Sequence, residues 1–102
     1  MNPIIAIVHK DRDSAYGMTF PDAPGCFSAA DEIDDLFANA AEALELWTDA
    51  MREEGFLVPE PRALSQLLVD PEWTESFYTA ALVIQINPIY FHASDYNNGA
   101  QV

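Results

Sequence analysis

The stretch over residues 16–27 constrains the fold most, because it joins a strand pattern to a connection rich in proline and glycine. It reads Tyr-Gly-Met-Thr-Phe-Pro-Asp-Ala-Pro-Gly-Cys-Phe. Tyr16, Met18 and Phe20 alternate with Gly and Thr, which is the period of a strand with one buried face. Pro21 has no amide hydrogen to donate to a sheet, so it ends this strand. The sequence therefore predicts a hairpin with a tight connection.

Two further apolar runs flank this hairpin strand. The β-branched run Ile4–Lys10 predicts a strand, and the polar cluster at 11–14 is typical of the turn that follows it. Another run opens at Cys26 and extends to Ala30. The sequence therefore predicts three consecutive antiparallel strands.

Residues 31–54 carry the pattern of one long helix. Acidic residues at 31–35 favour a helix start, because carboxylates cap free amide groups and complement the helix dipole. Gly55 is the expected stop. Apolar residues recur at helical spacing, which predicts a stripe that faces the sheet with Trp47 as its largest anchor. The stripe contains Phe37, Ala40, Leu44, Trp47 and Met51.

The opposite side of the same helix is acidic. We call this set the acidic ridge: Asp35, Glu42, Glu45, Asp49 and Glu53. A run of charge is most often a solvated face, but the whole chain has 17 acids, four bases and a formal net charge of −13, which is more than solubility requires. Such a charge attracts basic partners and opposes unaided binding to nucleic acid or to an anionic membrane.

The second half of the chain predicts a short helix and one further strand. Pro59-Glu60-Pro61 is a rigid connection, and residues 62–69 have the composition of a short helix. Trp73 is expected to seal an edge of the core. Alternating apolar residues over 77–86 predict a fourth strand.

Together these elements predict an α+β domain over residues 1–86. It would hold a three-stranded antiparallel sheet, one long helix packed on the sheet, a short helix and a further strand. Residues 87–102 are expected to be a C-terminal tail without clear periodicity. A chain of 102 residues suits one domain with a modest core. One cysteine, no leader pattern and no apolar run of about 20 residues lead us to expect a cytoplasmic protein.

The sequence offers little for catalysis. His9 and His92 lack the spacing of a zinc site, and Cys26 lies in an apolar run that is typical of a core. Capping explains the carboxylates at 31–35. We therefore expect no catalytic residue, no metal and no cofactor. A ribonuclease H-like nuclease, the least favoured alternative, would need carboxylates that converge on divalent metal ions.

The run over residues 16–28, followed by acidic residues and an Ala-, Glu- and Leu-rich helix around 38–47, resembles the HicB-type antitoxin family. The resemblance covers roughly residues 1 to 86. It implies a partial ribonuclease H-like fold without catalysis. It also implies a partner, a small basic HicA-type toxin that cleaves messenger RNA and is blocked by the HicB-type protein.

The leading hypothesis is an antitoxin that neutralises a basic HicA-type toxin by occluding its active surface, and that forms a homo-oligomer, a dimer or a tetramer. The residues expected to contact the partner are Asp35, Glu42, Glu45, Asp49, Glu53, Tyr16, Phe20 and Asp22. The alternative is a DNA-binding transcriptional autoregulator, because many family members carry a C-terminal DNA-binding module. No Lys or Arg follows Arg62. We therefore expect this module to be absent or degenerate, and no DNA binding through this chain alone.

Overall fold

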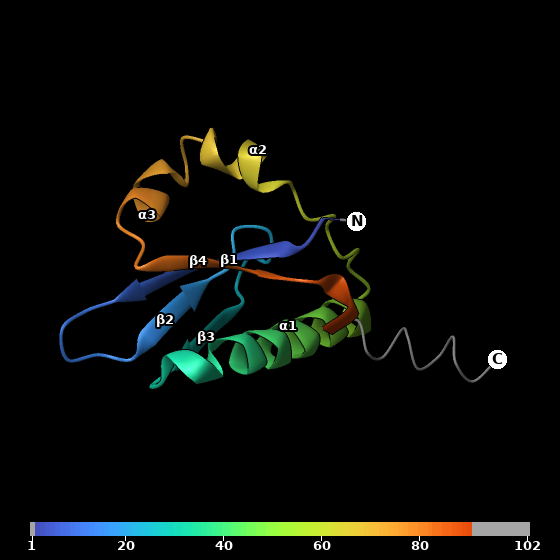
Figure 1. Ribbon diagram of the computed structural model, residues 1–102. Coiled ribbons are helices and arrows are strands. Elements are labelled where there is room, and N and C mark those ends of the chain that lie inside the picture. The colour runs from blue at the N-terminus through green and yellow to red at the C-terminus, as the bar shows by residue number, and fades with distance from the viewer. Residues whose placement is uncertain (1, 91–102) are drawn as a thin grey trace.

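The computed structural model describes residues 2–90, which fold into a four-stranded antiparallel sheet with helices on both faces (Figure 1). The strands are β1 (Ile4–Lys10), β2 (Tyr16–Thr19), β3 (Phe27–Ala30) and β4 (Leu82–Ile86), in the spatial order β3-β2-β1-β4. The predicted succession of three antiparallel strands is confirmed, and β4 joins the same sheet beside β1. Beyond Tyr90, the predicted tail lies outside the described residues.

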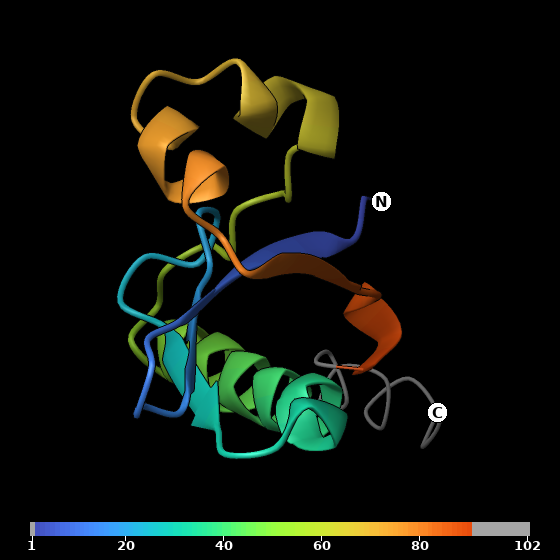
Figure 2. The same cartoon turned by 60° about the vertical axis from the view of Figure 1, so that its left-hand side comes forward.

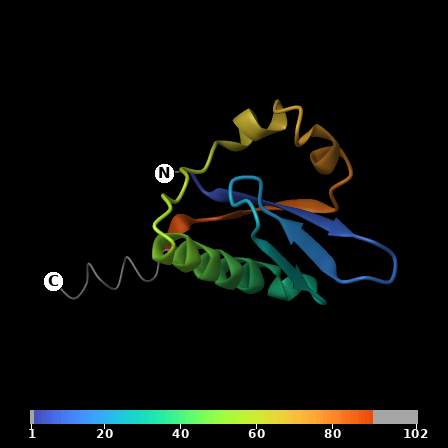
Figure 3. The same cartoon turned by 180° about the vertical axis from the view of Figure 1, so that it is seen from behind.

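The helices form two layers, one on each side of the sheet. They are η1 (Ile33–Asp35), α1 (Leu36–Glu53), α2 (Leu64–Leu68), α3 (Thr74–Tyr78) and η2 (Pro88–Tyr90). Helix α1 lies on one face, and α2 and α3 lie on the other; the three views agree on this (Figures 1, 2 and 3). None of the described helices is long and apolar enough to cross a membrane.

Strand β1 is apolar throughout its first five residues because its two sides lie in different cores. Ile4, Ala6 and Val8 belong to the larger core on the side of α1. Ile5 and Ile7 belong to a smaller core, where Leu67 of α2 is also buried. A central strand that is covered on both faces buries every residue, so its sequence does not alternate.

The buried side of α1 agrees with the predicted stripe except at Phe37. Its buried residues are Leu36, Ala40, Leu44 and Thr48. Phe37, predicted to face the sheet, is 43% exposed, and its ring lies edge-on to Tyr90 with the centroids 5.0 Å apart. Trp47 is half-buried against the larger core, and its indole N–H donates to the Pro24 carbonyl oxygen at 2.9 Å. The small side chains of Ala30 and Ala40, both buried, permit close packing of α1 on β3.

The predicted fourth strand begins too early. Residues 62–69 contain α2, as predicted, but Phe77 and Tyr78 end helix α3, and the strand begins only at Leu82. The Phe77 amide donates to the Trp73 carbonyl oxygen at 3.0 Å, and both rings pack in the smaller core. A helical turn places these two aromatic residues on one side, and this packing outweighs the strand preference of Phe and Tyr.

Candidate protein-interaction site

Four residues of the acidic ridge lie on the side of α1 that faces away from the sheet, and the fifth, Asp35, is the N-cap of α1. Asp35, Glu42 and Glu53 are exposed, and Glu45 and Asp49 are half-buried, so the structure buries none of the five. The sheet-facing side is defined by the buried residues of α1, which are spaced four apart. The helical period therefore predicted the acidic face correctly. Whether this face contacts a partner stays a proposal.

The carboxylates at the start of the helix do not cap it by hydrogen bonds. Glu32 and Asp35 occupy the N-cap positions of η1 and α1, and neither side chain makes a capping hydrogen bond. The predicted hydrogen-bonded capping is wrong at these two positions. Their carboxylates can still favour the helix start through the charge interaction with the helix dipole. Within residues 2–90, no group of three or more His, Cys, Asp and Glu side chains could hold a metal ion.

The hairpin residues named from the sequence occupy three different environments. Tyr16 is half-buried, with the Lys10 ammonium 5.6 Å from its ring centroid. Phe20 is 2% exposed and belongs to the larger core, so its side chain is not available to a partner. Phe27 is 69% exposed and lines a groove of about 320 Å³ beside Trp73. Phe27 therefore replaces Phe20 as the candidate contact.

Asp22 takes part in an ion-pair cluster that the sequence did not indicate. Its carboxylate accepts hydrogen bonds from the Arg62 backbone amide at 2.7 Å and from Arg62 Nε at 2.9 Å, and Arg62 Nη2 lies 2.9 Å from it. Arg62 Nη1 donates to Asp70 at 2.9 Å. These residues come from three different connections between the elements. The cluster ties the β2–β3 connection to the segments on either side of α2.

The cluster also predicts a pH dependence of stability. The Glu72 backbone amide and the Arg62 side chain, in that order, lower the pKa of Asp70 below its usual value. A lowered pKa stabilises the fold above the unfolded value of about 3.9, and this stabilisation is lost as the pH falls through the folded value. We expect Asp70→Asn to remove this part of the acid sensitivity.

The measurement is a series of urea unfolding midpoints between neutral pH and about pH 2.5, below the usual aspartate pKa. Below about pH 4, where Asp70 of the unfolded chain begins to bind protons, the parent should lose stability more steeply than the variant. Parallel curves for the two proteins would contradict a role for Asp70.

Cys26 has the properties of a core residue, as its sequence environment predicted. It is 5% exposed, and burial raises the pKa of its thiol to about 11. The thiol is therefore protonated at neutral pH, whereas nucleophilic attack and metal binding require the thiolate.

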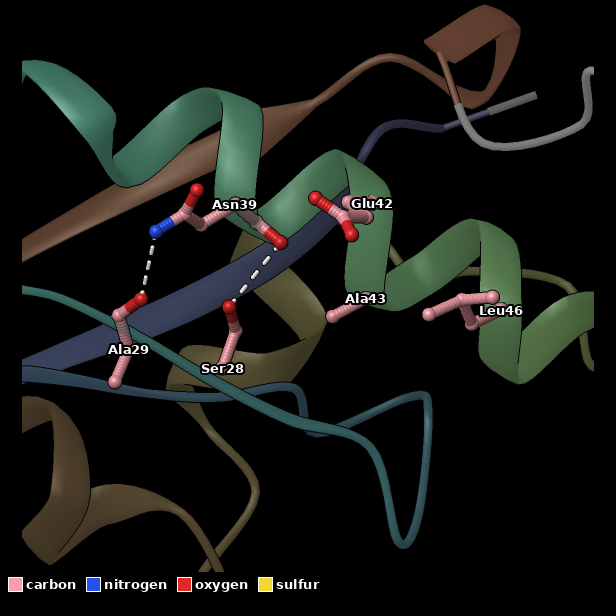
Figure 4. Close-up of a pocket in the computed structure, with 6 residues that line it drawn as sticks. All are labelled: Ser28, Ala29, Asn39, Glu42, Ala43 and Leu46. Atoms are coloured by element: carbon pink, nitrogen blue, oxygen red, sulfur yellow. Dashed lines mark hydrogen bonds between the residues drawn. The ribbon is translucent and has the colours of Figure 1, made fainter.

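A groove runs between β3 and α1, and the ridge residue Glu42 lines it (Figure 4). The groove has a volume of about 330 Å³. Ser28 Oγ donates to the Asn39 carbonyl oxygen at 3.1 Å, and Asn39 Nδ2 donates to the Ala29 carbonyl oxygen at 2.9 Å. These two bonds fix α1 against the edge strand. The lining residues are Ser28, Ala29, Asn39, Glu42, Ala43 and Leu46.

Residues 4–97 match the protein family described as "HicB_like antitoxin of bacterial toxin-antitoxin system". This chain belongs to the HicB-like antitoxin family. The crystal structure of the Burkholderia pseudomallei antitoxin HicB is similar, with a TM-score of 0.65 and 34% identity over 85% of this chain. A chain of the HicA3 and HicB3 toxin–antitoxin complex gives a TM-score of 0.62 and 26% identity, covering 84% of this chain and 94% of that one.

A curated relative extends the comparison to a bacteriophage. An uncharacterized 14.9 kDa protein of Haemophilus phage HP1 is 32% identical over 72 residues, which is 71% of this chain. The HicB-like chain spans 53% of the length of that phage protein and 62% of the Burkholderia antitoxin. The matches confirm the predicted family and its α+β fold, with four strands in one sheet.

Proposed function

We propose that this HicB-like chain is an antitoxin that binds a HicA-type toxin and neutralises it without catalysis, by occluding its active surface. The observation that carries the proposal is the likeness to a chain of the HicA3 and HicB3 toxin–antitoxin complex, over 84% of the present chain. Membership of the antitoxin family over residues 4–97 supports the same role. The predicted homo-oligomer stays a prediction.

The electrostatics of α1 favour a basic partner. The ridge presents carboxylates from a helix of 18 residues that packs on the sheet, on a chain with a formal net charge of −13. Charges on a rigid element attract an oppositely charged protein over about 10 Å in 0.1 M salt. Acidic side chains can also occupy the positions that RNA phosphates would take on a ribonuclease. The ridge is therefore the proposed steering surface, and Phe27 is the proposed apolar contact.

This division of roles between the ridge and Phe27 predicts separate effects on the association and dissociation rates of the complex. Replacing three ridge acids outside the groove, Asp35→Asn, Glu45→Gln and Glu53→Gln, should slow association about 10-fold at low salt, because charge steers encounter. The salt dependence of association should flatten, and dissociation should change little. The matched control is Phe27→Ala, which should speed dissociation and leave association almost unchanged.

The measurement is surface-immobilised binding kinetics, at two salt concentrations, against a purified HicA-type toxin. If the triple variant associates at the parental rate at both salts, the ridge is a solvated face without a steering role. If the parent does not bind, the proposed function fails.

A further inference from the structure

The groove between β3 and α1 is rich in oxygen atoms. The hydroxyl hydrogen of Ser28 and an amide hydrogen of Asn39 are already used in the bonds to Asn39 and Ala29. What the groove still offers is the Glu42 carboxylate, the Asn39 side-chain oxygen, the lone pairs of the Ser28 hydroxyl oxygen and the second amide hydrogen of Asn39. No Lys, Arg or His is among its described lining residues. The groove is therefore built mainly of hydrogen-bond acceptors, with one negative charge.

The remaining wall of the groove is apolar. Ala43 and Leu46 follow Asn39 and Glu42 along α1, and Figure 4 shows all four on the part of the helix beside Ser28 and Ala29. Leu46 is 64% exposed and lies one helical turn after Glu42. An exposed leucine beside a carboxylate gives an amphipathic surface. Lysine and arginine have the matching shape, an apolar stem that ends in a cation.

We propose that this groove takes one cationic side chain, an arginine or a lysine, of the protein that the antitoxin binds; the inference rests on the proposed function. Several acceptors around one carboxylate match a guanidinium with five N–H donors or an ammonium with three. The volume of about 330 Å³ lies at the small end of the roughly 300–1,000 Å³ of ligand pockets. It suits a single side chain better than a larger ligand.

The proposal separates Glu42 from the other ridge acids. A carboxylate that holds a cation in a groove should act mainly on dissociation, whereas a ridge acid outside the groove should act mainly on association. Glu53 is the matched control, because it is an exposed glutamate on the same helix that does not line the groove. Glu42→Gln should speed dissociation roughly 10- to 100-fold, and Glu53→Gln should change it less than about 3-fold.

A double-mutant cycle identifies the cation. Each Lys and Arg of the HicA-type partner is replaced by alanine and tested with the parent antitoxin and with Glu42→Gln. One cation is expected to couple to Glu42 by roughly 10-fold and to Glu53 by less than about 2-fold, since coupling energies arise between residues in contact. Equal effects of Glu42→Gln and Glu53→Gln, or no coupled cation, would overturn the groove proposal while leaving the parent's toxin binding intact.

A probe without toxin keeps the two proposals distinguishable. Backbone amide shifts of the antitoxin are followed by NMR during a titration with N-acetylarginine amide, and with N-acetylcitrulline amide as the uncharged control. The arginine derivative should shift the amides of Ser28, Asn39 and Glu42 in the parent, and the Glu42→Gln variant should lose this response. If the toxin does not bind but these shifts occur, the proposed function fails and the cation groove stands. If neither occurs, both fail.

Discussion

Replacing Phe20 by alanine should lower the free energy of unfolding by about 3–5 kcal/mol, the usual range for Phe→Ala in a core. Phe20 is 2% exposed and packs in the larger core, so the change removes buried apolar surface and leaves a cavity. A loss of this size is a large fraction of the roughly 5–15 kcal/mol that stabilises a typical domain.

The matched control is Phe27→Ala, a change of the same residue type at the other end of the same connection. Phe27 is 69% exposed, so the loss should stay below about 1 kcal/mol. Urea unfolding of both variants, followed by tryptophan fluorescence, measures the difference. Similar losses at the two positions would contradict the burial of Phe20.

Replacing Asp22 by alanine should lower the free energy of unfolding by about 2–4 kcal/mol. The change removes charged hydrogen bonds and takes away one of the two carboxylates that pair with Arg62. The Asp22 side chain is 9% exposed, which limits screening by water, whereas Arg62 is 39% exposed and keeps part of its hydration. The loss should therefore be smaller than for a fully buried pair.

Asp13→Ala is the control for Asp22, because Asp13 is an exposed residue of the β1–β2 turn. Its loss should stay within about 0.5 kcal/mol, as for most surface changes. Urea unfolding at neutral pH and at moderate salt compares the two variants. If Asp22→Ala unfolds at the parental midpoint, the ion-pair cluster does not stabilise the fold.

Local patterns predicted the elements best where one face of an element is buried. The alternation that ends in Phe20 and the helical period of α1 both report a single buried side, so the strands and the helix were predictable. The exposure of Phe37 was not predictable, because its contact with Tyr90 at the far end of the described chain leaves no local signal. The predicted start of β4 was also wrong, because Phe77 packs in a helix against the smaller core, which only the folded chain creates.

The candidate site was predictable in part. The acidic ridge follows from the helical period alone, so its residues could be placed on one side of the helical segment. The groove depends on β3 lying against α1, and the ion pairs of Arg62 join residues 40 and eight positions apart. Contacts of this kind arise from the topology of the fold and leave no periodic signal in the sequence.

The most direct test of the antitoxin proposal is an RNA-cleavage assay with a purified HicA-type toxin. The purified toxin is titrated with the HicB-like chain, with Glu42→Gln and with an unrelated acidic protein of similar size. The account predicts that cleavage stops near stoichiometric amounts of the parent chain and that the unrelated acidic protein has no effect. Glu42→Gln should require a higher concentration for the same inhibition. Undiminished cleavage at a several-fold excess of the parent chain would contradict the account.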